Sequence, residues 1–178
     1  MLCFWLLSPS LAASYEYRIL STFRASTMEK EMNEAADAGF VFAELMTGEP
    51  AVRQDEVLVI MQRDTTAAST PKRTYKVLAT GRTSTMEKEM QQLGEDGFEY
   101  KAQTEFKASS IGRELSVIME RDLTAPSRKI EYRLLSTARK STMQKELNQA
   151  GDAGFRLAGV TSAKAFIGEQ EICILRKD

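Results

Sequence analysis

The residues best placed for chemistry recur three times with one spacing. They follow the pattern T-x-R-x-S-T. The copies are Thr22, Arg24, Ser26 and Thr27; Thr80, Arg82, Ser84 and Thr85; and Thr137, Arg139, Ser141 and Thr142. Each copy lies at a predicted helix start, where free backbone amides and the helix dipole attract anions. A guanidinium and hydroxyl groups would add donors. The pattern therefore indicates three sites for a small anion such as phosphate, sulfate or a carboxylate.

An internal role for the three arginines is the alternative, and we favour it because duplication alone keeps copies alike. The arginines would pair with the aspartates that end each repeat or with a neighbouring repeat. These aspartates are Asp64, Asp122 and Asp178. The serines have their own explanation, because each precedes Glu or Gln by three positions, as in a capping box. We therefore expect Ser26, Ser84 and Ser141 to be helix N-caps.

Other chemistry is limited by what the chain lacks. The 178 residues contain no histidine, which removes the commonest general base and the usual transition-metal ligand. CxxC, GxGxxG, P-loop and EF-hand patterns are also absent from the sequence. Carboxylates such as Glu29, Glu31 and Asp37 fit a solvated helix face with i, i+4 partners. We predict no catalytic residue, no metal site and no cofactor, and lean away from an enzyme.

The sulfur-containing residues are expected in the core rather than at a metal site. The helix methionines recur at i and i+4 on one apolar stripe. They are Met28, Met32, Met86, Met90 and Met143. Cys173 stands in an apolar run, which predicts a buried thiol rather than a nucleophile.

Composition places the chain among ordinary globular proteins, with 43% hydrophobic and 28% charged residues. The 24 Lys and Arg balance 25 Asp and Glu, so no global field attracts nucleic acid. We expect a protein or a small anionic ligand as partner, no nucleic acid and no membrane span.

Internal repetition decides the architecture. The segments starting at Tyr17, Tyr75 and Tyr132 are closely similar. The predicted ranges are a leader at 1–14, repeats at 15–64, 73–122 and 129–178, and polar linkers at 65–72 and 123–128.

The residue pattern of each repeat predicts a strand, a helix and two more strands. Alternation of Tyr15, Tyr17 and Ile19 with polar residues indicates a half-buried first strand. The helix should end at a glycine, Gly39 in the first repeat, and an aromatic residue should open the second strand. The apolar third strand, Val57 to Met61 in the first repeat, should be central or face another repeat.

The predicted fold is therefore α+β, with three small, mostly antiparallel sheets that each carry one helix on one face. A unit of 50 residues is near the lower limit for an independent core, so the repeats should pack together. They could close around a pseudo-threefold axis or form a row. We lean to the closed form because it hides sheet edges.

The first fourteen residues, MLCFWLLSPSLAAS, are uncharged and begin with an apolar run. They match the end of a signal peptide without its basic n-region, and are too short to span a bilayer. We expect an exported chain that begins near Tyr15, with a cytoplasmic location as the alternative.

The repeats resemble a small bacterial family, the domain of unknown function numbered forty-one seventy-seven. The similarity rests on YKV at Tyr75 and on the segments Leu93–Glu99 and Leu147–Phe155, with Phe where that family usually has Trp. It covers each unit and implies a fold but little chemistry.

The sequence thus predicts an exported repeat protein that acts as a binding or scaffolding module. The runner-up is an enzyme that uses carboxylates and arginine in a cleft between repeats. A purely structural envelope protein is the third candidate.

Overall fold

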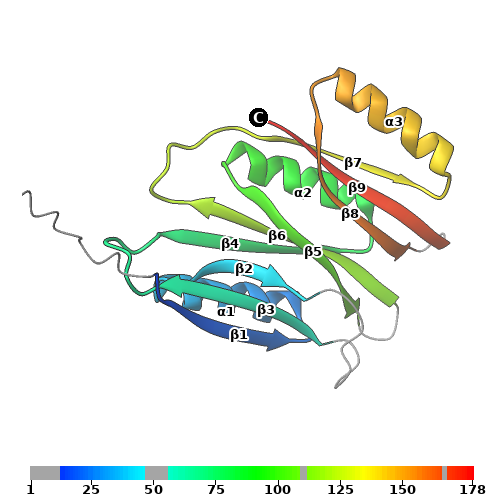
Figure 1. The fold of residues 1–178 in the computed structure, drawn as a ribbon. Helices are drawn as coiled ribbons and strands as arrows, with labels where there is room; N and C mark the ends of the chain where they lie inside the picture. The colour runs from blue at the N-terminus through cyan, green and yellow to red at the C-terminus, as the bar shows by residue number, and fades with distance from the viewer. Residues whose placement is uncertain (1–12, 47–55, 109–111, 166–167) are drawn as a thin grey trace, which may run out of the picture.

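The computed structural model describes residues 13–46, 56–108, 112–165 and 168–178. It has three units, each made of a strand, a helix and two further strands (Figure 1). The first has β1 (Tyr15–Thr22), α1 (Ala25–Asp37), β2 (Val41–Leu45) and β3 (Val57–Asp64); the second has β4 (Arg73–Thr80), α2 (Thr83–Glu95), β5 (Glu99–Ala108) and β6 (Gly112–Asp122); the third has β7 (Glu131–Thr137), α3 (Lys140–Asp152), β8 (Arg156–Ala165) and β9 (Gly168–Lys177). The predicted α+β fold of three β-α-β-β repeats is confirmed. The predicted leader lies outside the described residues up to residue 12.

Each unit forms one three-stranded antiparallel sheet with its last strand in the centre. The strand orders are β1-β3-β2, β4-β6-β5 and β7-β9-β8. The first strand of every repeat is therefore an edge strand, whose outer backbone groups need partners from elsewhere. The register in the first sheet sets Tyr15 opposite Asp64 and Thr22 opposite Val57. The two ends of a repeat are consequently kept apart: the helix starts at one end of the sheet and the last residue of β3 lies at the other.

The helices begin at the arginines, so the predicted serine N-caps are wrong. The first helical hydrogen bond runs from the Met28 N–H to the Arg24 carbonyl oxygen at 3.0 Å. Arg24 keeps an extended backbone, with φ −136 and ψ 130, and Ser26 lies inside the first turn. The Thr22 hydroxyl accepts a hydrogen bond from the Arg24 N–H at 3.3 Å. This local turn ends the strand and makes arginine the last extended residue.

The helices end as predicted, at glycines with positive φ. Gly39, Gly97 and Gly154 have φ of 85, 84 and 87, where a side chain would be strained. The Phe40 N–H then returns to the Ala35 carbonyl at 3.0 Å, and this bond reverses the chain into β2.

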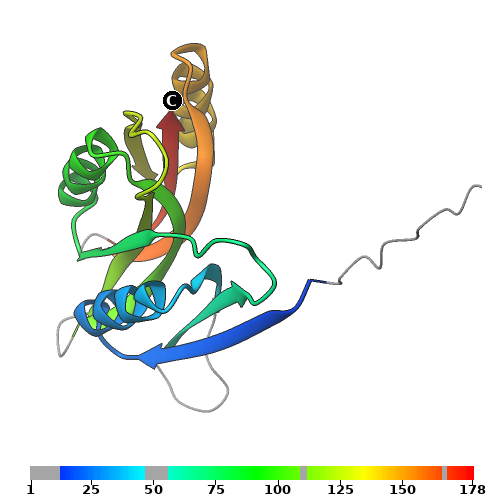
Figure 2. The same cartoon turned by 90° about the vertical axis from the view of Figure 1, so that its left-hand side faces the viewer.

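The repeats lie in a row, so the closed arrangement that we favoured is wrong. Figures 1 and 2 show the first repeat at one end, the third at the other and the second between them. In Figure 2, α1 lies between β1 of its own repeat and β4 of the next. In the same way, α2 contacts both β4 and β7. The first two helices thus each cover their own sheet and the first strand of the following sheet.

The core follows this arrangement, because each cluster of buried residues contains parts of two repeats. Met28 and Met32 of α1 pack with Tyr75 and Val77 of β4. Met86 and Met90 of α2 pack in the same manner with residues of β7 and β9, including Tyr132. The prediction that the methionines are core residues is confirmed.

The central strands are apolar for the reason predicted from the sequence. In β6, Val117 packs with the cluster around α2, while Ile118 belongs to the cluster around α1. Both faces of this strand are therefore covered. Cys173 of β9 is also buried, as predicted, with its Sγ 3.4 Å from the Met143 Sδ. No helix in the described part of the chain is long and apolar enough to cross a membrane.

Candidate functional site

The residues predicted to bind an anion lie at three separate helix starts. Arg24, Arg82 and Arg139 are all exposed, and none has an ion pair with a described residue. Their helices have no side-chain cap. The hydroxyl groups of Ser26 and Thr27, and of their counterparts, belong to the first helical turn rather than to a cap. The structure therefore does not bring the three copies together into one site.

The proposed pairing of these arginines with the repeat-end aspartates is wrong, because the sheet register separates them. Asp64 accepts hydrogen bonds from the Thr66 N–H and hydroxyl instead, which lower its pKa. Asp122 pairs with Arg73, and Asp178 pairs with Arg156 at 2.6 Å. All three aspartates have partners near the end of the sheet that is remote from the helix starts.

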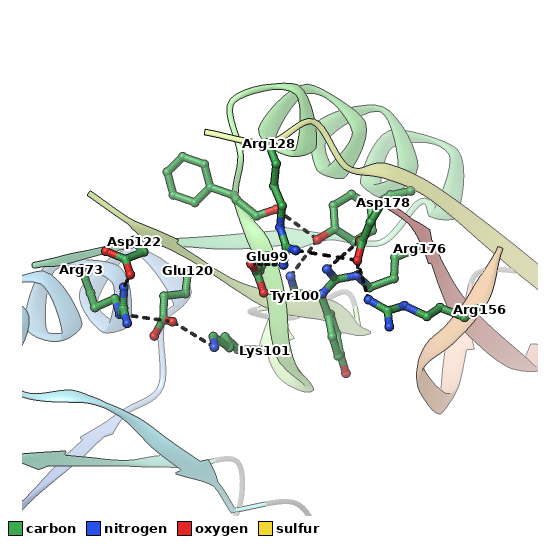
Figure 3. Close-up of polar contacts among 12 residues, drawn as sticks. Arg73, Glu99, Tyr100, Lys101, Glu120, Asp122, Arg128, Arg156, Arg176 and Asp178 are labelled. Atoms are coloured by element: carbon green, nitrogen blue, oxygen red, sulfur yellow. Dashed lines mark hydrogen bonds and ion pairs between the residues drawn. The ribbon is translucent and has the colours of Figure 1, made fainter. Parts of the chain in front are cut away.

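A charged hollow lies on the second repeat beside the linker to the third repeat. Its volume is about 370 Å³. Charged side chains that line it include Arg73, Glu99, Lys101, Glu120, Asp122 and Arg128. Figure 3 shows these side chains with their partners from the third repeat. Glu99 and Glu120 lie opposite each other on β5 and β6, so two carboxylates share one face of the sheet.

Every carboxylate that lines the hollow already has a cation beside it. Glu120 is 2.9 Å from the Lys101 ammonium and accepts a hydrogen bond from the Tyr75 hydroxyl at 2.7 Å. Glu99 is 2.6 Å from Arg128 and 3.6 Å from Arg176 of the third repeat. The hollow is therefore an ion-pair network that links two repeats.

The neighbouring cations lower the pKa of Glu99 and so limit the chemistry that this carboxylate can perform. Burial opposes ionisation of Glu99, yet its hydrogen bond to Arg128 and the neighbouring cations hold its pKa below the usual value. General acid catalysis at neutral pH needs a raised pKa, and a general base works best with a pKa near the operating pH. Glu99 fits neither role.

The best-defined recognition geometry is the joint between the first and second repeats. Asn33 of α1 brackets the edge of β4: its Oδ1 accepts from the Tyr75 N–H and its Nδ2 donates to the Tyr75 carbonyl oxygen, both at 3.0 Å. One turn earlier, Glu29 accepts from the Val77 N–H at 3.0 Å and pairs with Lys76 at 2.9 Å. The helix thus satisfies backbone groups that an edge strand otherwise exposes.

The tyrosine of the incoming strand completes this joint. The Tyr75 side chain is fully buried, and its hydroxyl accepts from the Phe42 N–H at 2.8 Å. A bulge interrupts the β2 ladder between Phe42 and Glu44, and such a bulge leaves backbone groups for other partners. Burial and the nearby Glu120 raise the Tyr75 pKa, so the hydroxyl stays protonated and donates to that carboxylate.

The joint between the second and third repeats has the same form. The Gln91 side chain accepts from the Tyr132 N–H at 2.9 Å, and the Gly94 carbonyl accepts from the Ile130 N–H at 3.0 Å. The Tyr132 hydroxyl accepts from the Tyr100 N–H at 2.8 Å and donates to the carbonyl oxygen of Phe98, the residue just before β5, at 3.0 Å. A Cβ on Gly94 would lie 2.1 Å from the Ile130 carbonyl oxygen, so the strand passes against the helix backbone.

At the N-terminal end of the row, the strand half of such a joint has no helix partner among the described residues. Tyr17 and Ile19 of β1 correspond to strand residues that are buried in the next two repeats, and Tyr15 corresponds to the half-buried Arg73 and the buried Ile130. In β1, however, Tyr15, Tyr17 and Ile19 are 49%, 61% and 68% exposed. The predicted alternation is present, but the expected burial is wrong, because this face is covered by the helix of a preceding repeat. We call these three side chains the β1 surface.

At the other end of the row, the helix half of a joint has no incoming strand against it in the part of the chain that the structure describes. Gln144, Asn148 and Gly151 of α3 stand where α1 and α2 hold the next strand, and all three are exposed. Beside them, Leu157 and Val160 of β8 are 56% and 62% exposed. A Cβ on Gly151 would meet no atom within 4 Å. We call these five residues the α3 surface.

Comparisons with protein-family models, curated proteins and solved structures found no match to this chain. The resemblance to the bacterial family of unknown function therefore stays a prediction from its motif.

The residues of the joint were not singled out from the sequence, although a signal was present. Asn33, Gln91 and Asn148 place a side-chain amide at one helical position in all three repeats. Two repeats have glycine three residues later, inside the helix, where it lowers helix stability. Neither feature is explained by capping, so both could have indicated contact with a neighbouring backbone.

Proposed function

We propose that this protein is a non-catalytic scaffolding module that captures an extended polypeptide segment on its α3 surface. One observation carries the proposal: two helices of the row already hold a neighbouring edge strand through side-chain hydrogen bonds to its backbone. The third helix has an exposed amide side chain, Asn148, at the same position, with no incoming strand of the described residues against it. Main-chain bonds along an exposed edge supply affinity, and a side-chain pocket supplies selectivity. In both occupied joints, the side chain of the incoming strand whose hydroxyl accepts a hydrogen bond at the bulge is a tyrosine.

A labelled peptide with the sequence of residues 129–137, KIEYRLLST, is the matching probe. In the chain, this segment is the one that α2 holds. We expect saturable binding to the whole protein by fluorescence anisotropy. A peptide with alanine in place of tyrosine should bind at least ~10-fold more weakly, since it loses two hydrogen bonds and a large buried ring.

The control variant is Gly151→Gln, which fills the position where the strand passes without touching the occupied joints. It should abolish binding and leave the fold intact, because the space around Gly151 is open. Absence of saturable binding at about 1 mM peptide, the weak end of specific recognition, would count against strand capture. Equal binding of both peptides would do the same.

A small anion is the second candidate ligand. Three helix starts without a side-chain cap, each beside an exposed arginine, favour it. Phosphate or sulfate at millimolar concentration should raise the melting temperature, and a variant with alanine at Arg24, Arg82 and Arg139 should lose the rise. An equal rise in that variant would show a general salt effect instead.

Export of the chain is part of the proposal. A cut in the leader after Ala12 or Ala13 would leave β1 whole, because that strand begins at Tyr15. The capture surfaces would then face a compartment outside the cytoplasm. N-terminal sequencing of the protein purified from its source should find a start close to Tyr15. A chain that still begins with Met1 would contradict export.

A further inference from the structure

We propose that the segment captured on the α3 surface is β1 of a second copy of this chain, so that copies join head to tail. This inference rests on the proposed function and names its partner. The two unused halves of a joint lie at opposite ends of the row, one strand and one helix (Figures 1 and 2). A second copy would supply each half with the other.

β1 has the features of the strands that the helices already hold. Its register repeats that of the two strands already held: Tyr17 lies opposite Gln62, Tyr75 opposite Glu120 and Tyr132 opposite Arg176. The outward backbone groups of Tyr17 therefore have the same spacing as those that Asn33 brackets on Tyr75. In the proposed joint, Asn148 of the neighbouring copy would take the place of Asn33.

The side chains of β1 also match the groups that the third repeat offers. The tyrosine hydroxyl in each occupied joint accepts the N–H of the residue before the bulge, which is Phe42 or Tyr100. The third repeat has the same bulge between Leu157 and Gly159. The Tyr17 hydroxyl of a second copy would therefore meet the Leu157 N–H. Ile19 would bring its apolar side chain to the helix, as Val77 does in the first joint.

Exposed apolar side chains are concentrated on the β1 surface and the α3 surface. The described part of the chain has seven exposed large hydrophobic side chains, and five of them belong to the two surfaces. Leu45 and Gln103, the counterparts of Val160 in the first two repeats, are only 4% and 8% exposed. Val160 is therefore exposed because no strand from beyond its own sheet lies against α3 in the described part of the chain, and not because this position is polar in character.

The two surfaces are different, so the contact is heterologous. Such a contact leaves a free strand at one end of every oligomer and a free helix at the other, and it gives open filaments or closed rings rather than a limited dimer. The free edge of β1 is also a backbone template, which proteins normally protect. A specific helix partner would provide that protection.

Sedimentation velocity of the whole chain over a range of concentrations tests this inference, with two blocking variants. The double variant Tyr17→Ala, Ile19→Lys removes the strand half, and Gly151→Gln fills the helix half. Both change exposed positions, so both should keep the circular dichroism spectrum of the unmodified chain. Leu123→Lys is the matched control, because Leu123 is 55% exposed but belongs to neither surface.

The unmodified chain and the control should form oligomers that grow with concentration. Each blocking variant alone should remain a monomer. An equal mixture of the two should form a 1:1 dimer that does not grow, because one variant keeps a free helix and the other a free strand. A monomeric unmodified chain, oligomers of either variant alone, or a mixture that stays monomeric would each overturn head-to-tail assembly.

These outcomes are separable from those of the proposed function. If the tyrosine peptide binds the α3 surface but the mixture stays monomeric, strand capture stands and its partner is foreign. If the mixture dimerises and the free peptide competes with it, both statements stand.

Discussion

Replacing Tyr132 by phenylalanine removes one hydroxyl group from the joint between the second and third repeats, and so tests what its hydrogen bonds contribute to stability. The hydroxyl accepts from the Tyr100 N–H at 2.8 Å and donates to the Phe98 carbonyl at 3.0 Å. The ring stays in place in the variant, so packing is retained. What changes is that two backbone groups in a closed joint lose their partner.

The expected loss of stability follows from these two groups. A buried polar group left without a partner costs about 1–3 kcal/mol. Both groups together predict a decrease of about 2–6 kcal/mol in the free energy of unfolding, since the Tyr132 side chain is only 4% exposed. Tyr17→Phe is the matched control. Its ring is 61% exposed, so the change should stay within ~0.5 kcal/mol.

Urea denaturation followed by circular dichroism measures the difference. With a slope of roughly 2 kcal/mol per molar urea, the midpoint of Tyr132→Phe should fall by about 1–3 M while the slope stays constant. The protein should be kept dilute, so that self-association does not contribute. Equal midpoints for the two variants would refute the view that the tyrosine hydroxyl joins the repeats.

Four further results are expected from single sites. Gly94→Ala should destabilise the fold by about 1–3 kcal/mol in the same urea assay, because its Cβ would overlap a backbone carbonyl of the third repeat, whereas Gly151→Ala should be neutral or stabilise the helix by ~1 kcal/mol. The Glu99 pKa is lowered in the fold, so its ion pairs stabilise the protein above its usual pKa of 4.5 and are lost as the pH falls through the folded value; Glu99→Gln should flatten the acid limb of a stability-against-pH curve. Burial raises the Tyr100 pKa to about 12, so its contribution is complete below pH 10 and disappears as the pH rises through 12; a phenolate titration that showed all tyrosines ionising together near pH 10 in folded protein would contradict this. Cys173 is buried with a raised pKa, and a thiol reagent should label it only after unfolding.

Much of the architecture could be predicted from local pattern. The glycines after each helix fix its end because a positive φ is needed there, and the methionine stripe fixes its buried face. The apolar run at Val117 and Ile118 correctly indicated a strand covered on both faces. These features depend on residues close together in sequence, so one repeat contains enough information to predict them.

The arrangement of the repeats could not be predicted in this way. The contacts that decide between a row and a ring are made by a few groups, such as the Asn33 amide against the edge of β4. A polar residue on an exposed helix face has the same sequence signature whether it meets water or a neighbouring backbone. Tyr75 is buried and Tyr17 is exposed although their local sequences are nearly alike. The difference comes from the neighbouring helix, which lies against Tyr75 and has no counterpart at Tyr17 among the described residues.

The serine caps were wrong for a physical reason of a different kind. A Ser with Glu or Gln three residues later fits a capping box. The Thr22 hydroxyl, however, accepts the Arg24 N–H, and the helix starts two residues earlier, with Arg24 in place of Ser26 as its N-cap. Competing local hydrogen bonds of this type are decided by the backbone, which sequence spacing does not define.

Hydrogen exchange at the backbone amides of Tyr17, Tyr75 and Tyr132 tests the account most directly. The three amides occupy one position in three repeats, and among the described residues only two of them have a helix partner. We predict slow exchange at Tyr75 and Tyr132 at every concentration. At Tyr17 we predict fast exchange in dilute protein that slows on concentration, and no such slowing in Gly151→Gln. A Tyr17 amide that exchanges at one rate at all concentrations would contradict strand capture between copies.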